Sequence, residues 1–240
     1  MSFNLESKIQ TLKPGEYQCL ADLNIYDSPS CDRLATQAAT GRYLWVTSSY
    51  QDIETLHATS VQVCLSEDDY PGWLSLSDLG LLQSCTLPYK AKTFSESEIK
   101  KRLPEVIEFT QKAMQQPNYY LWGGTVGPNY DCSGLMQAAF ASVGIYIPRD
   151  AYQQEDFTQS ISIAELQPGN LVFFGTSQKA THVGLYLGDG CYIHSSGKVI
   201  GRNGIGIDRL SEQGDEVSQS YYQQLRGAGR VVKSYEPQQR

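Results

Sequence analysis

GPNYDCSGLMQAAF, residues 127–140, joins a turn-forming segment to an almost wholly apolar one. Cys132 stands where the two meet, at the start of a predicted buried helix, whereas a structural cysteine would sit comfortably inside the apolar run. In the first turn of a helix, unpaired backbone N–H groups and the helix dipole lower the pKa of a thiol toward the reactive thiolate. Asp131 can cap this helix, but its negative charge raises the pKa of the neighbouring thiol. We therefore expect a histidine base close to Cys132.

Two of the three histidines, His182 and His194, lie on neighbouring predicted strands of one hairpin, residues 181–197. Side chains alternate between the two faces of a strand, so the length of the loop decides whether the two rings share a face. With a three-residue loop, Gly184 lies opposite His194 and leaves room for its ring, and the histidines are diagonal neighbours. With a two-residue loop, His194 lies opposite Leu185, on the wrong face. The first arrangement supplies a nucleophile, a base and a residue that orients the base.

Four side chains could alternatively be counted as the ligands of a zinc ion: Cys132, His182, Cys191 and His194. Cys191 and His194 are three residues apart on one strand, however, and so point to opposite faces. We therefore expect a thiol-based site that uses no metal and no organic cofactor. His57 has no comparable partner and is expected to be a surface or turn residue.

Length and composition describe an ordinary globular chain of 240 residues, 40% hydrophobic and 19% charged, with room for one large domain or two small ones. The net charge of -7, with no block of like charge, argues against a nucleic-acid partner. No apolar run approaches the roughly 18 residues of a membrane span. The N-terminus has no apolar segment behind a basic start, so we expect a cytoplasmic protein in which most of the six scattered cysteines are reduced and buried.

Residues 15–85 contain short apolar segments separated by turn residues, a spacing typical of a small β-barrel. The expected strands are EYQCLA (16–21), NIY (24–26), RYLWVTSS (42–49), SVQVCL (60–65) and GWLSL (72–76). We place this first domain at residues 1–86, a linker at 87–94 and a second domain at 95–240.

The second domain is expected to begin with two helices. Ser95 and Glu98 fit a capping box that opens the first of them. This helix is predicted to end near Arg102, because Pro104 cannot continue it. Pro104 instead fits the first turn of a second helix, which ends near residue 116.

The remainder of the second domain predicts one more helix and then an antiparallel sheet, an α+β order. The helix covers residues 132–143, is apolar on all sides and stops at Gly144. The expected strands are 171–175, 181–188 and 191–197, followed by a late hairpin near 201–208 and a closing strand at 229–235.

Four segments, in this order, resemble the NlpC-type, papain-like cysteine peptidases of bacterial cell-wall peptide metabolism: YYLWGG (119–124), DCSG (131–134), LQPGNLVFF (166–174) and HVGLYLGDGCYIH (182–194). The resemblance covers about residues 95–240 and implies a papain-like fold. It also implies Cys132 as the nucleophile, His182 as its base and His194 as the orienting third residue. DDYPGWLSLSD (68–78) is similar to the last part of a bacterial SH3-like barrel.

This pairing of domains is similar to that of the γ-D-glutamyl-diamino acid endopeptidases of the family. Those enzymes cut between D-Glu and diaminopimelate or lysine in short peptidoglycan stem peptides with a free N-terminal L-Ala. The resemblance implies that Asp131 pairs with the α-ammonium group of such a substrate. Ser133, Tyr120 and Trp122 match positions that line the same pocket. Tyr70 matches a barrel residue that closes the subsite for the amine.

Two positions depart from the pattern of the family. Ala151 stands where related enzymes usually offer a serine hydroxyl to the substrate, so that one hydrogen bond is expected to be missing or moved. Asn170 stands where an acid is commoner, which we interpret as a detail of a turn. Neither position is one of the three expected catalytic residues.

The sequence therefore predicts a cysteine endopeptidase that hydrolyses the γ-D-glutamyl-diamino acid bond of peptidoglycan-derived tripeptides or tetrapeptides, in the recycling of released wall peptides, with no obligate protein partner. Diaminopimelate and lysine both fit as the diamino acid. One alternative is an amidase or acyltransferase of the same fold with another substrate. A second is a module that binds cell-wall peptides without cleaving them, against which the intact Cys132, His182 and His194 argue.

Overall fold

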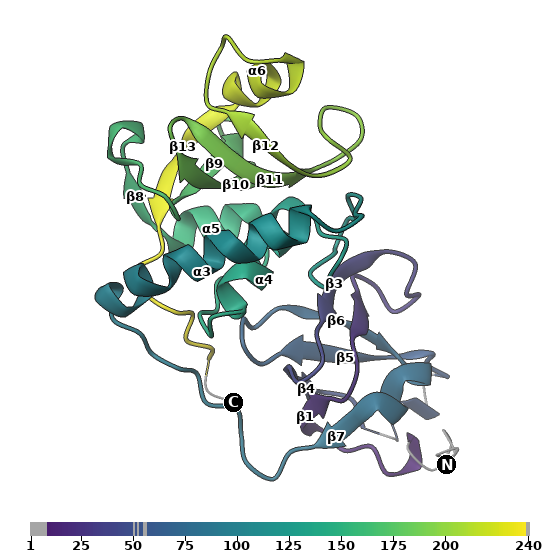
Figure 1. The fold of residues 1–240 in the computed structure, drawn as a ribbon. Coiled ribbons are helices and arrows are strands. Elements are labelled where there is room, and N and C mark those ends of the chain that lie inside the picture. Colours follow the sequence, from purple (N-terminus) through teal and green to yellow (C-terminus); the bar gives the residue numbers. More distant parts are fainter. Residues whose placement is uncertain (1–8, 50, 52, 55–56, 239–240) are drawn as a thin grey trace. The chain divides into compact units, whose positions relative to one another are not determined.

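The computed structural model describes residues 9–238 apart from 50, 52, 55 and 56, and these residues form two compact units (Figure 1). One unit is Lys92–Tyr235. The other combines the chain up to Ala91 with the C-terminal segment that starts at Glu236, where the backbone N–H of Gln238 donates to Asp69 Oδ2 at 2.8 Å. Within the described ranges, no helix has both the length and the apolar character needed to cross a membrane.

The first unit is built on an antiparallel sheet, seven-stranded in its described part, with the order β3-β2-β6-β5-β4-β1-β7. Its strands are β1 (Gly15–Cys19), β2 (Leu23–Tyr26), β3 (Leu34–Ala38), β4 (Tyr43–Val46), β5 (Ser60–Leu65), β6 (Pro71–Ser75) and β7 (Leu82–Ser84), with the 3-10 helix η1 (Leu76–Leu81) between the last two. Val61, Val63 and Leu65 point from β5 into a core shared by these strands. Every predicted strand is present; β3 and β7 were not predicted because each is short and poor in β-branched residues.

The first unit contains a buried cluster of ion pairs. Glu67 accepts hydrogen bonds from the backbone N–H of Tyr43 at 2.7 Å and from Arg42 Nε at 3.1 Å. Arg42 Nη2 also bonds Asp68 Oδ1 at 3.1 Å. Burial raises the pKa of the Glu67 carboxyl group, and the Arg42 charge only partly opposes this rise.

Residues 92–235, all of which are described, form a six-stranded antiparallel sheet with helices on both faces (Figure 1). The strand order is β12-β11-β10-β9-β13-β8. The strands are β8 (Gln159–Ile161), β9 (Leu171–Gly175), β10 (Ala180–Gly188), β11 (Cys191–Ser196), β12 (Gly204–Arg209) and β13 (Leu225–Arg230). The helices are α3 (Glu96–Met114), α4 (Cys132–Ala141), α5 (Ala151–Phe157), α6 (Glu216–Tyr222) and the 3-10 turn η2 (Ile163–Glu165). The expected α+β class is confirmed.

Alternating side chains give the sheet two apolar faces. On one face, Val183 and Leu185 of β10 pack with α3, α4 and α5 in the larger core. On the other face, a smaller cluster joins Phe174 and Tyr192 to Tyr221 of α6. The helix α4 is buried on almost every side, as its sequence predicted, and Gly144 follows its end with a φ of 81°.

The helix α3 corrects the prediction of two helices separated near Arg102, because it runs without interruption through Pro104. Its start is as predicted: Ser95 and Glu98 form the capping box. Proline removes one backbone hydrogen bond from a helix. Ile99 and Val106, on either side of Pro104, are both buried against the same core, and this packing holds the two halves together as one helix.

The hairpin of β10 and β11 has the predicted phase, but it reaches that phase in another way. Gly188 pairs with Cys191, so only Asp189 and Gly190 form the turn, which by itself would give the wrong phase. A register shift between Tyr186 and Gly188 adds one residue to β10. Leu185 is therefore opposite Ile193. One residue further from the turn, Gly184 lies beside His194, as expected for the three-residue loop.

The closing strand lies earlier than predicted. Residues 229–235 were expected to form it, whereas β13 is Leu225–Arg230 and pairs with both β9 and β8. Two glycines in LRGAGR hide this strand from propensity arguments. Residues 201–208, where a late hairpin was expected, contain the single strand β12, which pairs with the preceding strand β11. The short elements α5, α6 and β8 were not predicted.

Candidate active site

Asp131 and Cys132 open the helix α4. Asp131 is the N-cap, and its Oδ1 accepts a hydrogen bond from the backbone N–H of Gly134 at 2.7 Å. Cys132 is the first helical residue and is 6% exposed. The backbone N–H groups of Ser133 and Val183 lower the pKa of its thiol. Val183 follows His182 in β10, the strand that carries the predicted base.

The pKa of the Cys132 thiol moves opposite to the direction expected from its place at a helix start. Burial raises this pKa to about 12, and the charge of Asp131 acts in the same direction. The backbone N–H donors and the charge of Arg149 lower it, but they do not outweigh burial. The thiol is therefore neutral at rest, and its proton has to be removed by a base when it reacts.

The histidines His182 and His194 meet as their strands predicted. Nε2 of His182 lies 2.6 Å from Nδ1 of His194, with the rings nearly perpendicular at 86°. Tyr221 of α6 stacks on His182 at 4.3 Å between ring centroids. Both histidines are buried, and burial lowers the pKa of each below the usual histidine value. They are therefore neutral near pH 7, and Nε2 is the nitrogen of His182 that faces His194.

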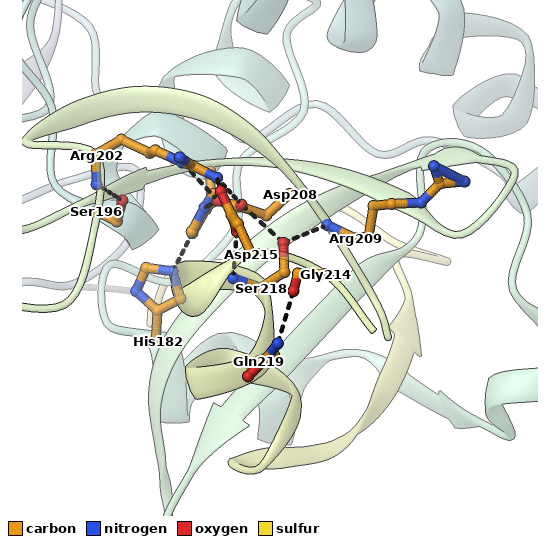
Figure 2. Close-up of polar contacts among 10 residues, drawn as sticks. His182, Ser196, Arg202, Asp208, Arg209, Gly214, Asp215, Ser218 and Gln219 are labelled. Carbon is orange, nitrogen blue, oxygen red and sulfur yellow. Dashed lines mark hydrogen bonds and ion pairs between the residues drawn. The ribbon is translucent and has the colours of Figure 1, made fainter. Parts of the chain in front are cut away.

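Asp208 extends this pair and was not predicted. Its Oδ2 lies 2.7 Å from Nε2 of His194. Figure 2 shows Asp208 also held by Arg202, which reaches on to Asp215, and by Ser218 of α6, whose Oγ donates at 3.0 Å. Burial alone would raise the pKa of Asp208, but the bonds from His194, Arg202 and Ser218 hold it well below its usual range. Asp208 is therefore a carboxylate.

Asp131 forms a buried ion pair with Arg149, also not predicted. Arg149 Nη2 lies 2.6 Å from Asp131 Oδ2, and Nη1 lies 3.1 Å from Oδ1. Oδ2 also accepts from the backbone N–H of Gly123 at 2.9 Å, which joins the loop before the helix to its N-cap. Ser133 is buried beside the pair, and its Oγ accepts from Arg149 Nη1 at 3.0 Å. These contacts use most of the acceptor capacity of the carboxylate.

The other predicted pocket residues differ in position. Burial raises the pKa of the Tyr120 phenol, and electrostatic interactions with Cys132 and Asp131 act in the same direction. Trp122 is 56% exposed. Ala151, where a serine hydroxyl is usual, is the buried first residue of α5. Tyr70 belongs to the other unit, where it packs partly against that core, so its part in a substrate site stays a prediction.

The predicted alternative of a zinc site depends on Cys191, and this residue is turned away from the histidines. Its sulfur contacts the backbone oxygen of Asp189 at 3.8 Å, in the turn of the hairpin. Within the described residues, no three histidine, cysteine, aspartate or glutamate side chains gather as a metal-binding group.

Two family models match the chain. Residues 117–226 match the NlpC/P60 family, and residues 25–79 match the bacterial dipeptidyl-peptidase SH3 domain. The chain is 38% identical to the probable endopeptidase p60 of Listeria seeligeri, over 47% of this chain and 19% of that protein. It is 44% identical to the bifunctional muramidase/DL-endopeptidase CwlT of Bacillus subtilis (strain 168), over 32% of this chain and 25% of that protein.

These alignments therefore span a quarter or less of the length of both curated relatives. The crystal structure of an NlpC/P60 family protein from Bacillus cereus ATCC 10987 is similar with a TM-score of 0.48 at 25% identity, over 96% of this chain and 67% of that one. The two matched segments contain the helix start at Cys132, both paired histidines and most strands of the first unit. The chain thus combines an NlpC/P60 domain of papain-like α+β fold with a bacterial SH3 domain.

Proposed function

We propose that this protein is a cysteine endopeptidase that hydrolyses the γ-D-glutamyl-diamino acid bond of short peptidoglycan stem peptides with a free N-terminal L-Ala. The observation that carries the proposal is one constellation inside the NlpC/P60 domain. Cys132 begins a buried helix, the backbone N–H of Val183, the residue after His182, lowers the pKa of its thiol, and Nε2 of His182 lies 2.6 Å from Nδ1 of His194. The name of the Bacillus subtilis relative, a DL-endopeptidase, agrees with a bond between a D-residue and an L-residue.

In the first half of the reaction, the thiol proton of Cys132 passes to Nδ1 of His182 as the sulfur attacks the γ-glutamyl carbonyl carbon. The proton transfer accompanies the attack because burial keeps the free thiol neutral. Backbone N–H groups at the start of α4 stabilise the oxyanion. The C–N bond then breaks, and the departing amine takes the proton from His182, which leaves a thioester on Cys132.

In the second half, His182 removes a proton from a water molecule, whose oxygen attacks the thioester carbonyl. The S–C bond breaks, the acid is released and the sulfur regains its proton from His182. Both halves need His182 to be neutral before each attack, which agrees with the lowered pKa of its buried ring.

For the substrate, we propose that Tyr120, Trp122 and Ser133 line the peptide pocket and that Tyr70 and Asp131 bind the free amine. The electrostatic influence of Cys132 and Asp131 on the phenol of Tyr120 supports the first part. The bonds of Asp131 to Arg149 oppose its role as an amine ligand, since an ammonium group would have to share or replace them. A peptide with a blocked amine separates these possibilities.

The test is cleavage of L-Ala-γ-D-Glu-diaminopimelate followed by mass spectrometry, beside the N-acetylated peptide. The lysine-containing peptide is a third substrate. We expect release of L-Ala-D-Glu from the free peptide, with a rate at least about a thousandfold lower for Cys132→Ala. Cys191→Ala is the matched control and should keep the wild-type rate, because Cys191 faces away from the histidines.

Cleavage of both the free and the acetylated peptide would keep the peptidase and remove the amine-binding roles of Asp131 and Tyr70. If neither is cleaved, the proposed substrate is wrong, and other amides or simple binding of cell-wall peptides become the alternatives to measure. We also propose that the protein acts in the cytoplasm on peptides released from the wall, which cell fractionation followed by immunoblotting would test.

A further inference from the structure

The base His182 is the first member of a chain of hydrogen bonds that leads through His194 to the buried carboxylate of Asp208. Figure 2 labels His182 and Asp208, the two ends of this chain. We propose that Asp208 is a positioning residue that acts through His194 and sets the tautomers of both histidines, so that His182 presents an unprotonated Nδ1 to Cys132. This inference rests on the proposed roles of Cys132 and His182. It adds a fourth member to the three residues expected from the sequence.

The direction of the bonds follows from the chemistry at Asp208. A carboxylate only accepts hydrogen bonds, so the proton between Asp208 and His194 belongs to Nε2 of His194. Three more donors hold the carboxylate: Arg202 Nη2, Arg202 Nε at 3.3 Å and Ser218 Oγ at 3.0 Å. Ser218 Oγ itself accepts from the backbone N–H of Arg209 at 3.2 Å, which leaves its own proton for Asp208.

A neutral imidazole with its proton on Nε2 has a lone pair on Nδ1. Nδ1 of His194 is therefore an acceptor, and the proton of the 2.6 Å bond belongs to Nε2 of His182. This leaves Nδ1 of His182 unprotonated and able to take the proton of Cys132. The resulting imidazolium keeps its bond to His194, and the negative charge of Asp208 favours it.

The substitution Asp208→Asn reverses the donor and acceptor roles along the hydrogen bonds from residue 208 to His182, because one acceptor oxygen becomes an NH2 donor. The size of the side chain hardly changes. Oδ1 faces two donors, Arg202 Nη2 and Ser218 Oγ, whereas Oδ2 faces His194 and the longer contact from Arg202 Nε. The amide oxygen therefore takes the place of Oδ1, and the NH2 group points at His194. His194 then carries its proton on Nδ1, and His182 also carries its proton on Nδ1, where it can no longer act as a base.

Asp215→Asn is the matched control. Asp215 accepts from the same Arg202 guanidinium group and is the N-cap of α6, where its Oδ1 accepts from the backbone N–H of Ser218 at 3.0 Å. Asparagine caps helices as well as aspartate does. The control removes one negative charge from the same network and leaves the bond between His194 and Asp208 in place.

The kinetic test measures kcat and KM for the free peptide with the wild type and the two variants. We expect Asp208→Asn to lower kcat by about 100-fold or more with KM changed less than about threefold. Asp215→Asn should stay within about threefold of the wild type in both constants. A folded Asp208→Asn variant with kcat within about tenfold of the wild type would overturn the proposal.

A second test reads the tautomers directly and needs no substrate. In ¹⁵N-histidine spectra of the full chain at about pH 7.5, assigned with His57→Gln and His194→Gln, we expect protons on Nε2 of both His182 and His194. Asp208→Asn should move both protons to Nδ1. A wild-type spectrum with Nδ1 of His194 protonated overturns the proposal, even if the variant does not fold. The expected tautomers together with no peptide cleavage would support Asp208 and contradict only the proposed reaction.

Discussion

The pKa of the Cys132 thiol is influenced by a buried anion and a buried cation. Asp131 raises the pKa of its thiol and Arg149 lowers it, and the two are paired at 2.6 Å, so their effects oppose each other. Burial therefore decides the net direction and keeps the thiol protonated. A neutral thiol needs a base that is ready to accept, which makes the tautomer of His182 more important than it would be beside a preformed thiolate.

The ion pair of Arg149 and Asp131 gives a prediction about stability. Arg149→Met removes the cation and leaves Asp131 as an uncompensated charge in a site where both side chains are nearly buried. Breaking such a pair costs about 3–5 kcal/mol, and we expect the second unit to lose stability in this range. The measurement is native-state hydrogen exchange of buried amides in α4 and β10 with increasing urea.

Lys112→Met is the control for this substitution. It removes a cation of the same unit from an exposed pair with Glu108, and such pairs contribute about 0.5 kcal/mol or less. Similar losses in the two variants would show that the buried pair has no special part in stability. A loss below about 1 kcal/mol for Arg149→Met would contradict the prediction outright.

The residues of the site differ in how far the sequence could predict them. Cys132, His182 and His194 were predictable because each is determined by a local pattern, a helix start or the alternation of a strand. Asp208 and Arg149 meet their partners across 14 and 18 residues of chain, after turns whose paths no local pattern sets. Alternation in β12 would have indicated Asp208 only once the pairing of His194 with Gly206 was known.

At the scale of elements, the hairpin of β10 and β11 is the part that positions the histidines. The close approach of the strands at Gly184 gives a second prediction. A Cβ atom at this position would lie 2.6 Å from Cδ2 of Tyr192 and 3.3 Å from Cβ of His194. Gly184→Ala should therefore lower the free energy of unfolding by about 1–3 kcal/mol and reduce kcat by displacing His194. Urea unfolding and the peptide assay measure the two effects.

Gly227→Ala, in β13 of the same sheet, is the matched control, since a Cβ atom there has no atom within 4 Å. We expect its stability and kcat to match the wild type within about 0.5 kcal/mol and twofold. If Gly184→Ala also matched the wild type, the hairpin would have space for a methyl group despite the short distances at this position. The distance between the strands would then not determine the position of the histidines.

Elements were predictable from the sequence where one local signal determines them, and not where packing decides. The capping box at Ser95 and the glycine stop at Gly144 are such signals. Pro104 is the opposite case: propensity predicts a break, and the burial of Ile99 and Val106 overrides it. The extra residue in β10 is also a matter of packing, because the bulge follows from where the two strands bury their faces and not from the turn sequence.

At the scale of the whole molecule, the two units contain buried titratable groups with opposite effects of pH. In the second unit, His182 and His194 have lowered pKa values, so the unfolded chain binds more protons than the folded one below about pH 6.5, and stability falls as the pH falls. In the first unit, Glu67 has a raised pKa, so its contribution is complete below about pH 4.5 and is lost as the pH rises through the folded pKa.

We therefore expect the two units to respond in opposite directions when the pH is lowered from about 7 to about 5. Calorimetry of the full chain should show two transitions, assigned with Val61→Ala in the first core and Leu135→Ala in the second, each of which lowers one transition only. The transition of the second unit should move to lower temperature. Each histidine lowers the free energy of unfolding by at most about 2 kcal/mol, because pH 5 lies about 1.5 units below the pKa of histidine in the unfolded chain. The transition of the first unit should rise, because the raised pKa of Glu67 means that the folded state binds this proton more tightly than the unfolded chain does. Two transitions that move in the same direction would mean that other groups control the pH dependence. If the transition of the second unit did not change with pH, His182 and His194 would titrate normally in the folded protein. They would then not be the buried neutral pair on which the proposed chemistry depends.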